Sequence, residues 1–555
     1  MNVCEALLDI LADYNVKYIF GIPGDAINEL IEAIRKQDKI KFIHVMHEES
    51  GAFAASAQAK LTGELAVCVG TAGPGGIHLL NGLYDAKMDH APVLAITGQI
   101  ETSLIGTAYQ QEVNIQALFE NVSVYNQTIY DAAQMPEVAT LAIQAALSKR
   151  SVSHLSIPSN VAVLKVPEYK RQKQIIHSNV LIRPGEDELK KAAALINKAG
   201  KPCILAGIGA KHAVNELEQL AALIKAPIIK ALRGKDILPD IHPYVIGGTG
   251  LLGTRPSLNA TQRCDLFIVV GSDFPYHDFY PSAGVSTIQV DHEPHHIGRR
   301  HPVDAPLIGD TKITLTELLK LVDEKTDDSF LKNAQNDMKE WLAGQDKIEL
   351  SADDPIHPQA AARAIGEQLS ENAIIACDTG TITVWGARNL RLKNGQKFTL
   401  SGGLASMAFA LPAAIGAKLS YPDRQVIALC GDGGFAMLMC DFATAVKYNL
   451  NIKIFVFNNS KLGLIQMEQE AAGNPEFQTS LHNPEYAEFA KNCGGDRFTI
   501  RTAAELNEGI SKALASTKPT VVNVFVNPDE LTWPPRVTMS QVLNYTKAKI
   551  KEFFA

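Results

Sequence analysis

The stretch Arg424–Gly463 constrains the fold more than any other part of the chain. A first apolar run ends at the glycine turn that holds Asp432, and a second apolar run ends at Asn459. Between them, residues 435–448 have apolar side chains at helical spacing. Strand, helix and strand in this order predict a βαβ unit with parallel strands. Asp432 and Asn459 therefore follow the carboxyl ends of two strands, where open α/β sheets bind ligands.

A carboxylate and an amide oxygen at neighbouring strand ends suit Mg²⁺, which prefers hard oxygen ligands together with the phosphates of a bound molecule. Gly433 and Gly434 let the backbone approach such a phosphate at the start of the helix. The alternative is a tight turn with a solvated aspartate. Because a GDGG turn is followed one crossover later by two asparagines, we favour a diphosphate–magnesium site.

This segment resembles the GDG…NN motif of enzymes that use thiamine diphosphate (ThDP). In that family the aspartate, the second asparagine and a backbone carbonyl two residues later hold the metal. The resemblance assigns the metal to Asp432, Asn459 and Lys461. It implies ThDP and Mg²⁺ as cofactors.

Composition is that of an ordinary globular enzyme. The 555 residues suggest about three domains, and a net charge of −8 with 20% charged residues gives no basic stripe for nucleic acid. The N-terminus mixes acids into its apolar run, unlike a signal peptide, and no stretch has the apolar length of a membrane span. The eight cysteines form no CxxC pair, which predicts free thiols in a reducing cytoplasm.

Glu48 is the residue of interest in the first part of the chain. It follows a predicted strand, 42–46, and precedes an alanine-rich helix, 50–60. The resemblance makes Glu48 the carboxyl group that hydrogen-bonds the pyrimidine ring of ThDP, so that the ring's own amino group becomes the base. The alternative is an acid at a helix start that interacts with the helix dipole. His78, in the segment TAGPGGIHLLNGL, has two interpretations, a helix cap or a catalytic group, and both stay open.

An internal repeat relates the two ends of the chain. Residues 57–61, which lead into LAVCVGTAGPGG, mirror residues 415–419, which lead into QVIALCGDGGF. Both copies read as a small-residue helix, a strand and a glycine turn, which predicts duplication of one α/β unit. The first copy supplies Glu48 and the second supplies the metal residues. In the family these come from different subunits, so the resemblance implies at least a homodimer and favours a homotetramer.

The middle of the chain contains a literal GxGxxG match at 248–253. No good strand precedes it and no clear helix follows it, so the match alone is weak. Together with GSDFPY and IQVDHEPHHIG it resembles the FAD-contacting segments of pyruvate oxidases and quinone-dependent pyruvate dehydrogenases. Structural turns are the alternative, and we favour FAD. The flavin contacts implied by the resemblance are Gly207, Gly209, Gly250, Leu251, Leu252, Gly253, Asp273, Phe274, Pro275, Asp291 (on the ribose hydroxyls) and Asp310.

A methionine precedes a second alanine-rich helix in the last third of the chain. In the family, a methionine at this place wedges between the two rings of the cofactor, whereas core filler is the alternative for Met407. The ThDP contacts that the resemblance implies are Gly73, Gly75, Asp378, Gly380, Ser406, Met407, Gly433, Gly434, Gly463 and Leu464.

The predicted fold is α/β, with three doubly wound domains of mostly parallel sheets, as in ThDP enzymes of the pyruvate oxidase type. The predicted domains are 1–175 (pyrimidine-binding), 184–340 (FAD-binding) and 355–535 (diphosphate- and Mg-binding), followed by a tail helix, 536–555. Polar stretches at 165–183 and 324–358 link them. For the tail we favour packing on its own domain over contact with the inner face of a membrane.

The choice of reaction rests on two segments. The segment 461–470 contains Glu468 and lacks the tryptophan of acetolactate synthases, and GSDFPYHDF replaces their arginine-bearing FDDR-like stretch. The resemblance gives the catalytic set Glu48, Gln111, Glu468 and His78, with Glu468 on the substrate side.

We therefore predict a flavoprotein that decarboxylates a 2-keto acid, pyruvate, on ThDP. The hydroxyethyl intermediate is oxidised through FAD to acetate or acetyl phosphate, and quinone, oxygen and a carrier all stay open as the electron acceptor. The alternatives are an acetolactate synthase-type carboligase with structural FAD and a non-catalytic cofactor-binding scaffold.

Overall fold

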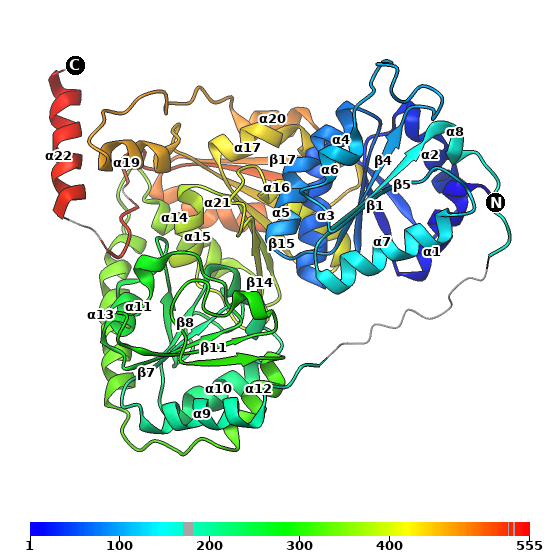
Figure 1. Ribbon diagram of the computed structural model, residues 1–555. Helices are drawn as coiled ribbons and strands as arrows, with labels where there is room; N and C mark the ends of the chain where they lie inside the picture. Colours follow the sequence, from blue (N-terminus) through cyan, green and yellow to red (C-terminus); the bar gives the residue numbers. More distant parts are fainter. Residues whose placement is uncertain (170–180, 531, 537–538, 555) are drawn as a thin grey trace.

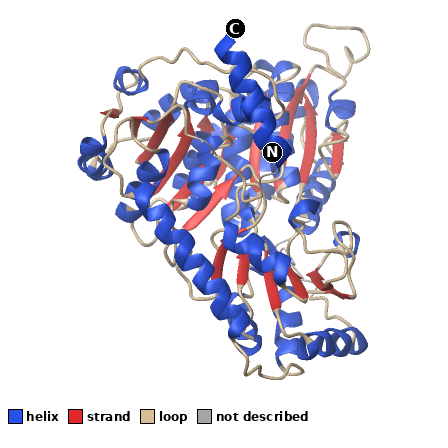
Figure 2. Cartoon of the chain, turned by 90° about the vertical axis from the view of Figure 1, so that its left-hand side faces the viewer, coloured by secondary structure: helices blue, strands red, loops and turns tan. Residues whose placement is uncertain are grey.

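Three six-stranded parallel sheets follow one another along the chain. They are seen in a computed structural model that describes residues 1–169, 181–530, 532–536 and 539–554. Helices cover both faces of each sheet (Figure 2). The N-terminal domain (blue) and the C-terminal domain (yellow to orange) lie side by side, with the middle domain (green) below them (Figure 1). The predicted α/β class with three doubly wound domains is confirmed.

The N-terminal sheet has the strand order β2-β1-β3-β4-β6-β5. Its strands are β1 (Tyr18–Gly21), β2 (Lys41–His44), β3 (Ala66–Gly70), β4 (Val93–Gln99), β5 (Tyr125–Thr128) and β6 (Val152–Pro158). Its helices are α1 (Val3–Asp13), α2 (Asn28–Arg35), α3 (Glu48–Thr62), α4 (Pro74–His78), α5 (Leu80–Met88), α6 (Ile115–Phe119), α7 (Met135–Lys149) and α8 (Ser159–Ala162).

The C-terminal sheet repeats this order as β14-β13-β15-β16-β18-β17. Its strands are β13 (Ile374–Cys377), β14 (Lys397–Leu400), β15 (Val426–Gly431), β16 (Ile452–Asn458), β17 (Asp496–Ile500) and β18 (Thr520–Phe525). Its helices are α14 (Pro358–Gln368), α15 (Thr381–Arg388), α16 (Ala410–Ser420), α17 (Asp432–Leu438), α18 (Phe442–Lys447), α19 (Gly463–Ala471), α20 (Tyr486–Asn492) and α21 (Ala503–Ala515). The same topology in both sheets agrees with the predicted duplication.

The middle sheet has a different order, β12-β11-β10-β7-β8-β9. Read from the β9 edge, with β7 counted as the first strand, this order is 3-2-1-4-5-6. This is the order of dinucleotide-binding sheets. Its strands are β7 (Pro202–Ala206), β8 (Ile228–Lys230), β9 (Val245–Gly248), β10 (Leu266–Val270), β11 (Ser286–Asp291) and β12 (Ala305–Ile308). Its helices are α9 (Glu186–Lys198), α10 (Val214–Ile224), α11 (Arg255–Arg263) and α12 (Thr311–Leu319).

Two predicted stretches differ from the structure. The polar link 324–358 contains a long helix, α13 (Ser329–Glu349), because a few apolar residues such as Leu331 and Ala334 bury one face while the rest of the helix is polar. The predicted single helix over 435–448 is interrupted by a 3₁₀ turn, Met439–Asp441, between α17 and α18. Residues 170–180 of the first predicted link lie outside the described residues.

Helix α3 packs directly against α16 and so joins the N- and C-terminal domains. A Cβ on Gly416 would lie 2.3 Å from the carbonyl oxygen of Ala54, so the two backbones touch. Beside this contact, the rings of Phe53 and Phe409 meet edge to face at 5.7 Å. Phe53 belongs to the same buried cluster as the apolar residues of the C-terminal domain. One continuous core therefore spans both domains.

The tail forms the helix α22 (Met539–Phe554), which packs on α19. Lys549 pairs with the buried carboxylate of Glu470 at 2.6 Å, and Lys551 donates to the carbonyl of Gly473. Packing on its own domain was the favoured interpretation of this segment. Among the described residues, no helix combines the length and the apolar run that crossing a membrane requires. All eight cysteines are free thiols, as predicted.

The contact of α3 with α16 makes a stability prediction. Gly416→Ala should lower the free energy of unfolding by about 1–3 kcal/mol, because the new methyl group would overlap a backbone carbonyl in a packed core. The control is Gly344→Ala on the exposed face of α13, where a Cβ meets nothing within 4 Å and alanine favours the helix. Thermal melting of both variants tests this; equal midpoints for the two would contradict the packing argument.

Candidate active site

Asp432 joins the ends of two neighbouring strands of the C-terminal sheet. β15 ends at Gly431, and Asp432 begins α17. Its side chain is buried, and its carboxylate accepts N–H groups from Gly433 at 2.9 Å and from Ser460, just past β16, at 2.7 Å. Burial raises the pKa of Asp432, and these hydrogen bonds offset the increase only in part.

The turn after β16 brings the other two predicted metal residues beside Asp432. Ser460 has a left-handed φ of 54°, and the N–H of Lys461 donates to Oδ1 of Asn459 at 3.2 Å. Among the described residues, no lysine or arginine pairs with the carboxylate of Asp432. A buried carboxylate without a protein cation, next to an amide oxygen and a backbone carbonyl, fits an Mg²⁺ ion held by oxygen ligands.

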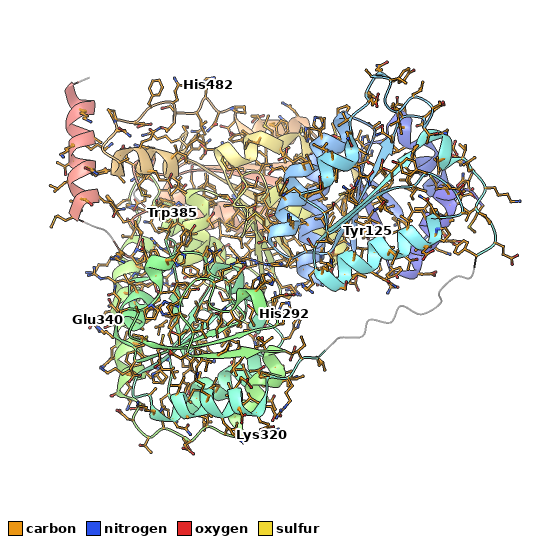
Figure 3. All side chains as sticks on the ribbon, in the orientation of Figure 1. Tyr125, His292, Lys320, Glu340, Trp385 and His482 are labelled. Carbon is orange, nitrogen blue, oxygen red and sulfur yellow. The ribbon has the colours of Figure 1, made fainter. Side chains whose placement is uncertain are left out.

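Asn483 is a residue of this site that the sequence analysis missed. Its Nδ2 donates to Asp432 at 2.7 Å and to Oδ1 of Asn458 at 3.1 Å. Tyr486 donates to Oδ1 of Asn483 at 2.9 Å, which fixes the orientation of the amide. The neighbouring His482 lies at the edge of the domain away from the middle domain (Figure 3). The signal in the sequence was small, an asparagine and a proline shortly before a helix.

Asp378 lies beneath the same glycine turn. It follows β13, and its Oδ1 accepts the N–H groups of Thr379 at 3.0 Å and Phe409 at 3.1 Å. Its other oxygen has no hydrogen-bond partner and lies 2.1 Å from where a Cβ of Gly434 would be. Burial raises the pKa of Asp378 to about 7. Gly380 has φ 124°, a conformation that requires glycine.

Met407 packs over the glycine turn. Its Cε lies 3.4 Å from the position of a Cβ on Gly433, and Leu462 and Leu481 approach the same position at 3.0 and 3.2 Å. Met407 is therefore at the proposed diphosphate site, not in a distant core. Its neighbour Ser406 accepts a hydrogen bond from Asn81 of the N-terminal domain at 3.0 Å.

Helix α19 begins at the same edge of the sheet. A Cβ on Gly463 would lie 3.1 Å from Nδ2 of Asn459, so the first turn of the helix rests on the predicted metal turn. Leu464 is in that first turn, and Glu468 follows one turn later as an exposed side chain. Residues four apart on a helix share a face.

Glu48 and His78 form a contact pair in the N-terminal domain. Glu48 begins α3 and is buried, and its Oε2 lies 3.0 Å from Nδ1 of His78. The ring of His78 stacks on the ring of His47 at 4.4 Å. His78 is the last residue of α4, so it does not cap the start of a helix. Its imidazole can exchange a proton with the Glu48 carboxyl group.

The glycine loop before α4 packs beside this pair. A Cβ on Gly75 would lie 3.3 Å from Oε1 of Glu48, and a Cβ on Gly73 would lie 2.8 Å from the carbonyl oxygen of Gln111. Gly73 has φ 61°, and Gln111 has φ 64°. The structure thus brings Glu48, His78, the glycine loop and Gln111 together.

Within one chain no direct contact joins the two groups. Among the described residues, no hydrogen bond or ion pair joins Glu48 to Asp432, Asn459 or Lys461. The domains meet nearby through Asn81 and Ser406.

The predicted flavin residues lie after the strands of the middle sheet. The turn of Gly207 and Gly209, after β7, packs on Gly271, after β10: a Cβ on Gly207 would lie 2.3 Å from the carbonyl oxygen of Gly271. These two strands are neighbours at the point where the strand order reverses, and there dinucleotides bind in sheets of this order.

The GxGxxG segment lies between a strand and a helix. The prediction that no good strand precedes it and no clear helix follows it is therefore wrong. β9 ends at Gly248 and α11 begins at Arg255. Both were hard to recognise because β9 is a short edge strand with two glycines and α11 has few apolar residues. Arg388 donates to the carbonyls of Leu251, Leu252 and Gly253 at 3.0–3.2 Å and fixes this loop to the C-terminal domain.

Three predicted flavin residues, Asp273, Phe274 and Pro275, follow the end of β10. Asp273 lies 3.9 Å from His90, and this contact holds its pKa below the usual range. Phe274 packs beneath Gly250, and a Cβ on Gly250 would lie 2.9 Å from the Phe274 ring. Pro275 is exposed.

The last two flavin candidates are aspartates. The carboxylate of Asp291 accepts the N–H of Glu293 at 3.0 Å. Asp310 caps α12 through the N–H of Ile313.

Three family models match the chain in the same order as its domains. They are described as the N-terminal TPP binding domain (residues 1–118), the central domain (189–318) and the C-terminal TPP binding domain (378–524) of thiamine pyrophosphate enzymes. The chain belongs to the thiamine pyrophosphate enzyme family. The Glu48 and Asp432 groups described above lie on its two TPP binding domains.

Similar proteins cover nearly the whole chain. A Bacillus subtilis protein, YdaP, named as thiamine pyrophosphate-containing, is 41% identical over 99% of this chain and 96% of its own. Pyruvate oxidase of Lactiplantibacillus plantarum is 32% identical over 94% and 88%. The acetolactate synthase large subunit of Cyanidium caldarium is 30% identical over 98% and 96%. The family is therefore shown, and its members include both enzyme types.

Asp378 makes a prediction about pH. Since its pKa is raised to about 7, the folded protein keeps a proton that the unfolded chain loses near its ordinary pKa. The bound proton therefore stabilises the folded protein at low pH, and this contribution to the free energy of unfolding is lost as the pH rises toward 7. Relative to Asp378→Asn, the wild type should lose up to about 4 kcal/mol across this window.

The measurement is urea unfolding of both proteins at several pH values. All other titrating groups are shared by the two proteins and cancel in the difference. A difference between the two that does not change with pH would show that Asp378 ionises normally.

Proposed function

We propose that this ThDP enzyme is a flavin-linked pyruvate oxidase or dehydrogenase. It decarboxylates pyruvate and passes two electrons to FAD, giving acetate with water or acetyl phosphate with phosphate. Bound ThDP supplies the nucleophilic carbon that adds to the keto group and that retains the electron pair when CO₂ leaves. The residues of this chain bind and bend the cofactor, move one proton and orient the substrate.

The observation that carries the proposal is the dinucleotide-binding strand order of the middle domain. Gly207 and Gly209 follow one strand at its switch point, and Asp273 follows the other. This placement supports FAD as the ligand. The similarity to a pyruvate oxidase supports pyruvate as the substrate.

Each group of residues has a role in this proposal. Asp432, Asn459 and the carbonyl of Lys461 hold Mg²⁺ and, through it, the diphosphate. Met407, which packs over the glycine turn, would contact the cofactor and favour its bent conformation. Glu48 bonds the pyrimidine ring, with His78 as its proton partner. Because Glu468 is exposed on α19 and Gln111 lies beside Gly73, these two side chains can face the substrate from opposite domains.

Because the two groups do not meet within one chain, we propose that the site is completed in a homodimer. The Glu48 group of one chain would then face the Asp432 group of the other. Large apolar side chains are exposed beside both groups, including Met46 and Ile77 in one domain and Met437 and Phe477 in the other. Exposed apolar surface of this kind is typical of association sites.

Anaerobic mixing with pyruvate tests the reaction. The protein, loaded with ThDP, Mg²⁺ and FAD, should lose its visible flavin absorbance because electrons reach the flavin. Acetate or acetyl phosphate should accumulate when an electron acceptor is added. Formation of acetolactate without bleaching would instead identify a carboligase of the acetolactate synthase type.

Glu48→Gln tests the proton-transfer role. We expect turnover to fall by about 10²–10⁴-fold, because a neutral amide cannot exchange a proton with the ring, while ThDP affinity stays close to that of the wild type. Glu49→Gln is the matched control, since Glu49 contacts Asn81 and not His78. Steady-state kinetics and ThDP titration check both variants. Normal turnover of Glu48→Gln would contradict a proton-transfer role for Glu48.

A further inference from the structure

The loop that carries Met407 is held in a strained conformation. Ala405 has φ 56° and Ala408 has φ 69°, so non-glycine residues on both sides of Ser406 and Met407 adopt left-handed backbone. Such conformations persist only where the surroundings hold them. Inside the loop, the N–H of Ser406 donates to the hydroxyl of Ser401 at 2.9 Å. Asp378 of the same domain accepts the N–H of Phe409 at the end of the loop at 3.1 Å, whereas the start of the loop is held from another domain.

Asp89 of the N-terminal domain holds the start of this loop. It follows α5 directly, and its buried carboxylate accepts the N–H of Gly402 at 2.9 Å and the N–H of Gly403 at 2.8 Å. The fit is close, because a Cβ on Gly403 would lie 2.9 Å from Met88. The end of α5 is thus seated on the loop with no space between the backbones.

Two cations keep this carboxylate ionised. Lys60 lies 2.6 Å from Asp89, and Nε of Arg233 lies 3.1 Å away. Burial alone would raise the pKa of Asp89, but the two cations outweigh it and hold the pKa below the usual range. Arg233 also donates to the Asp89 carbonyl at 2.6 Å. Since Arg233 belongs to the middle domain, Asp89 joins all three domains at one point.

We propose that Asp89 is a positioning residue that fixes the pose of Met407. The inference deepens the proposed function, because it rests on Met407 supporting the bent cofactor. Without the two charged hydrogen bonds, the strained loop relaxes and Met407 moves away from the glycine turn. ThDP still binds through its diphosphate, whereas its reactive carbon is activated less well.

Amide hydrogen exchange over residues 401–409 in the full-length protein without added cofactor tests the positioning. In Asp89→Asn, Gly402 and Gly403 should exchange at least about tenfold faster than in the wild type, because hydrogen bonds to an ionised acceptor are lost. The matched control is Asp85→Asn. Asp85 is equally buried and binds Lys60 at 2.7 Å and Ser56 at 2.6 Å, but it does not contact the loop. Unchanged exchange in Asp89→Asn, or equal acceleration in both variants, would overturn the proposal.

Gly403→Ala gives an independent test if Asp89→Asn does not fold. It leaves every charge in place and pushes the loop away from Met88, so exchange over 401–409 should again accelerate. If this variant folds and its loop exchanges as in the wild type, the proposal fails.

The second measurement is proton exchange at the reactive carbon of bound ThDP, followed by NMR at saturating ThDP and Mg²⁺ without pyruvate. Asp89→Asn should slow this exchange about tenfold, while the Kd for ThDP changes less than about threefold. An equal loss in Asp85→Asn, or none in Asp89→Asn, would contradict a positioning role. Neither readout uses pyruvate or flavin, so failure of the proposed oxidation would leave both intact.

Discussion

The packing of α3 against α16 is the contact on which the rest of the structure depends. The sequence of α3 is almost entirely small on its buried faces, so it can touch a sheet, α5 and α16 at once. A helix buried on all sides has fixed position and rotation. Its first residue is Glu48, and Lys60, near its other end, binds Asp89. One rigid helix therefore sets the location of the proposed proton-transfer group and of the anchor for the Met407 loop.

The duplicated topology explains why the residues of the proposed site are divided between two domains. In both sheets a glycine turn follows the third strand, at the point where the strand order reverses. In the C-terminal copy this turn carries Asp432, whose buried negative charge suits a metal and a diphosphate. In the N-terminal copy the turn has no acid, and the nearby carboxyl comes from Glu48 at the start of the preceding helix. The same topology thus places the buried Asp432 carboxylate after the third strand in one domain and the Glu48–His78 contact beside the third strand in the other.

Much of this could be predicted from the sequence because it depends on local patterns. Apolar runs ending in polar residues located Asp432 and Asn459 at the ends of two neighbouring strands. Asn483, Asp89 and Arg388 were missed because their partners are distant in the sequence. No periodicity or motif marks a side chain that binds a backbone group in another domain. The helix α13 was missed for a different reason: its buried face is narrow, so its sequence reads as a polar link.

Two of the missed residues, Asp89 and Arg388, share a physical role, since each is a charged group that fixes backbone of another domain. Arg388 binds three carbonyls of the middle domain, and Lys235 of the middle domain donates to the carbonyl of Ala387. Arg233 of the middle domain binds Asp89 of the N-terminal domain. Apolar packing alone tolerates small slips, whereas a buried charge loses much of its stabilisation if its partner moves. Hydrogen bonds from charged groups therefore hold both the 248–253 loop and the Met407 loop in place, as the proposed transfer of electrons between two cofactors would require.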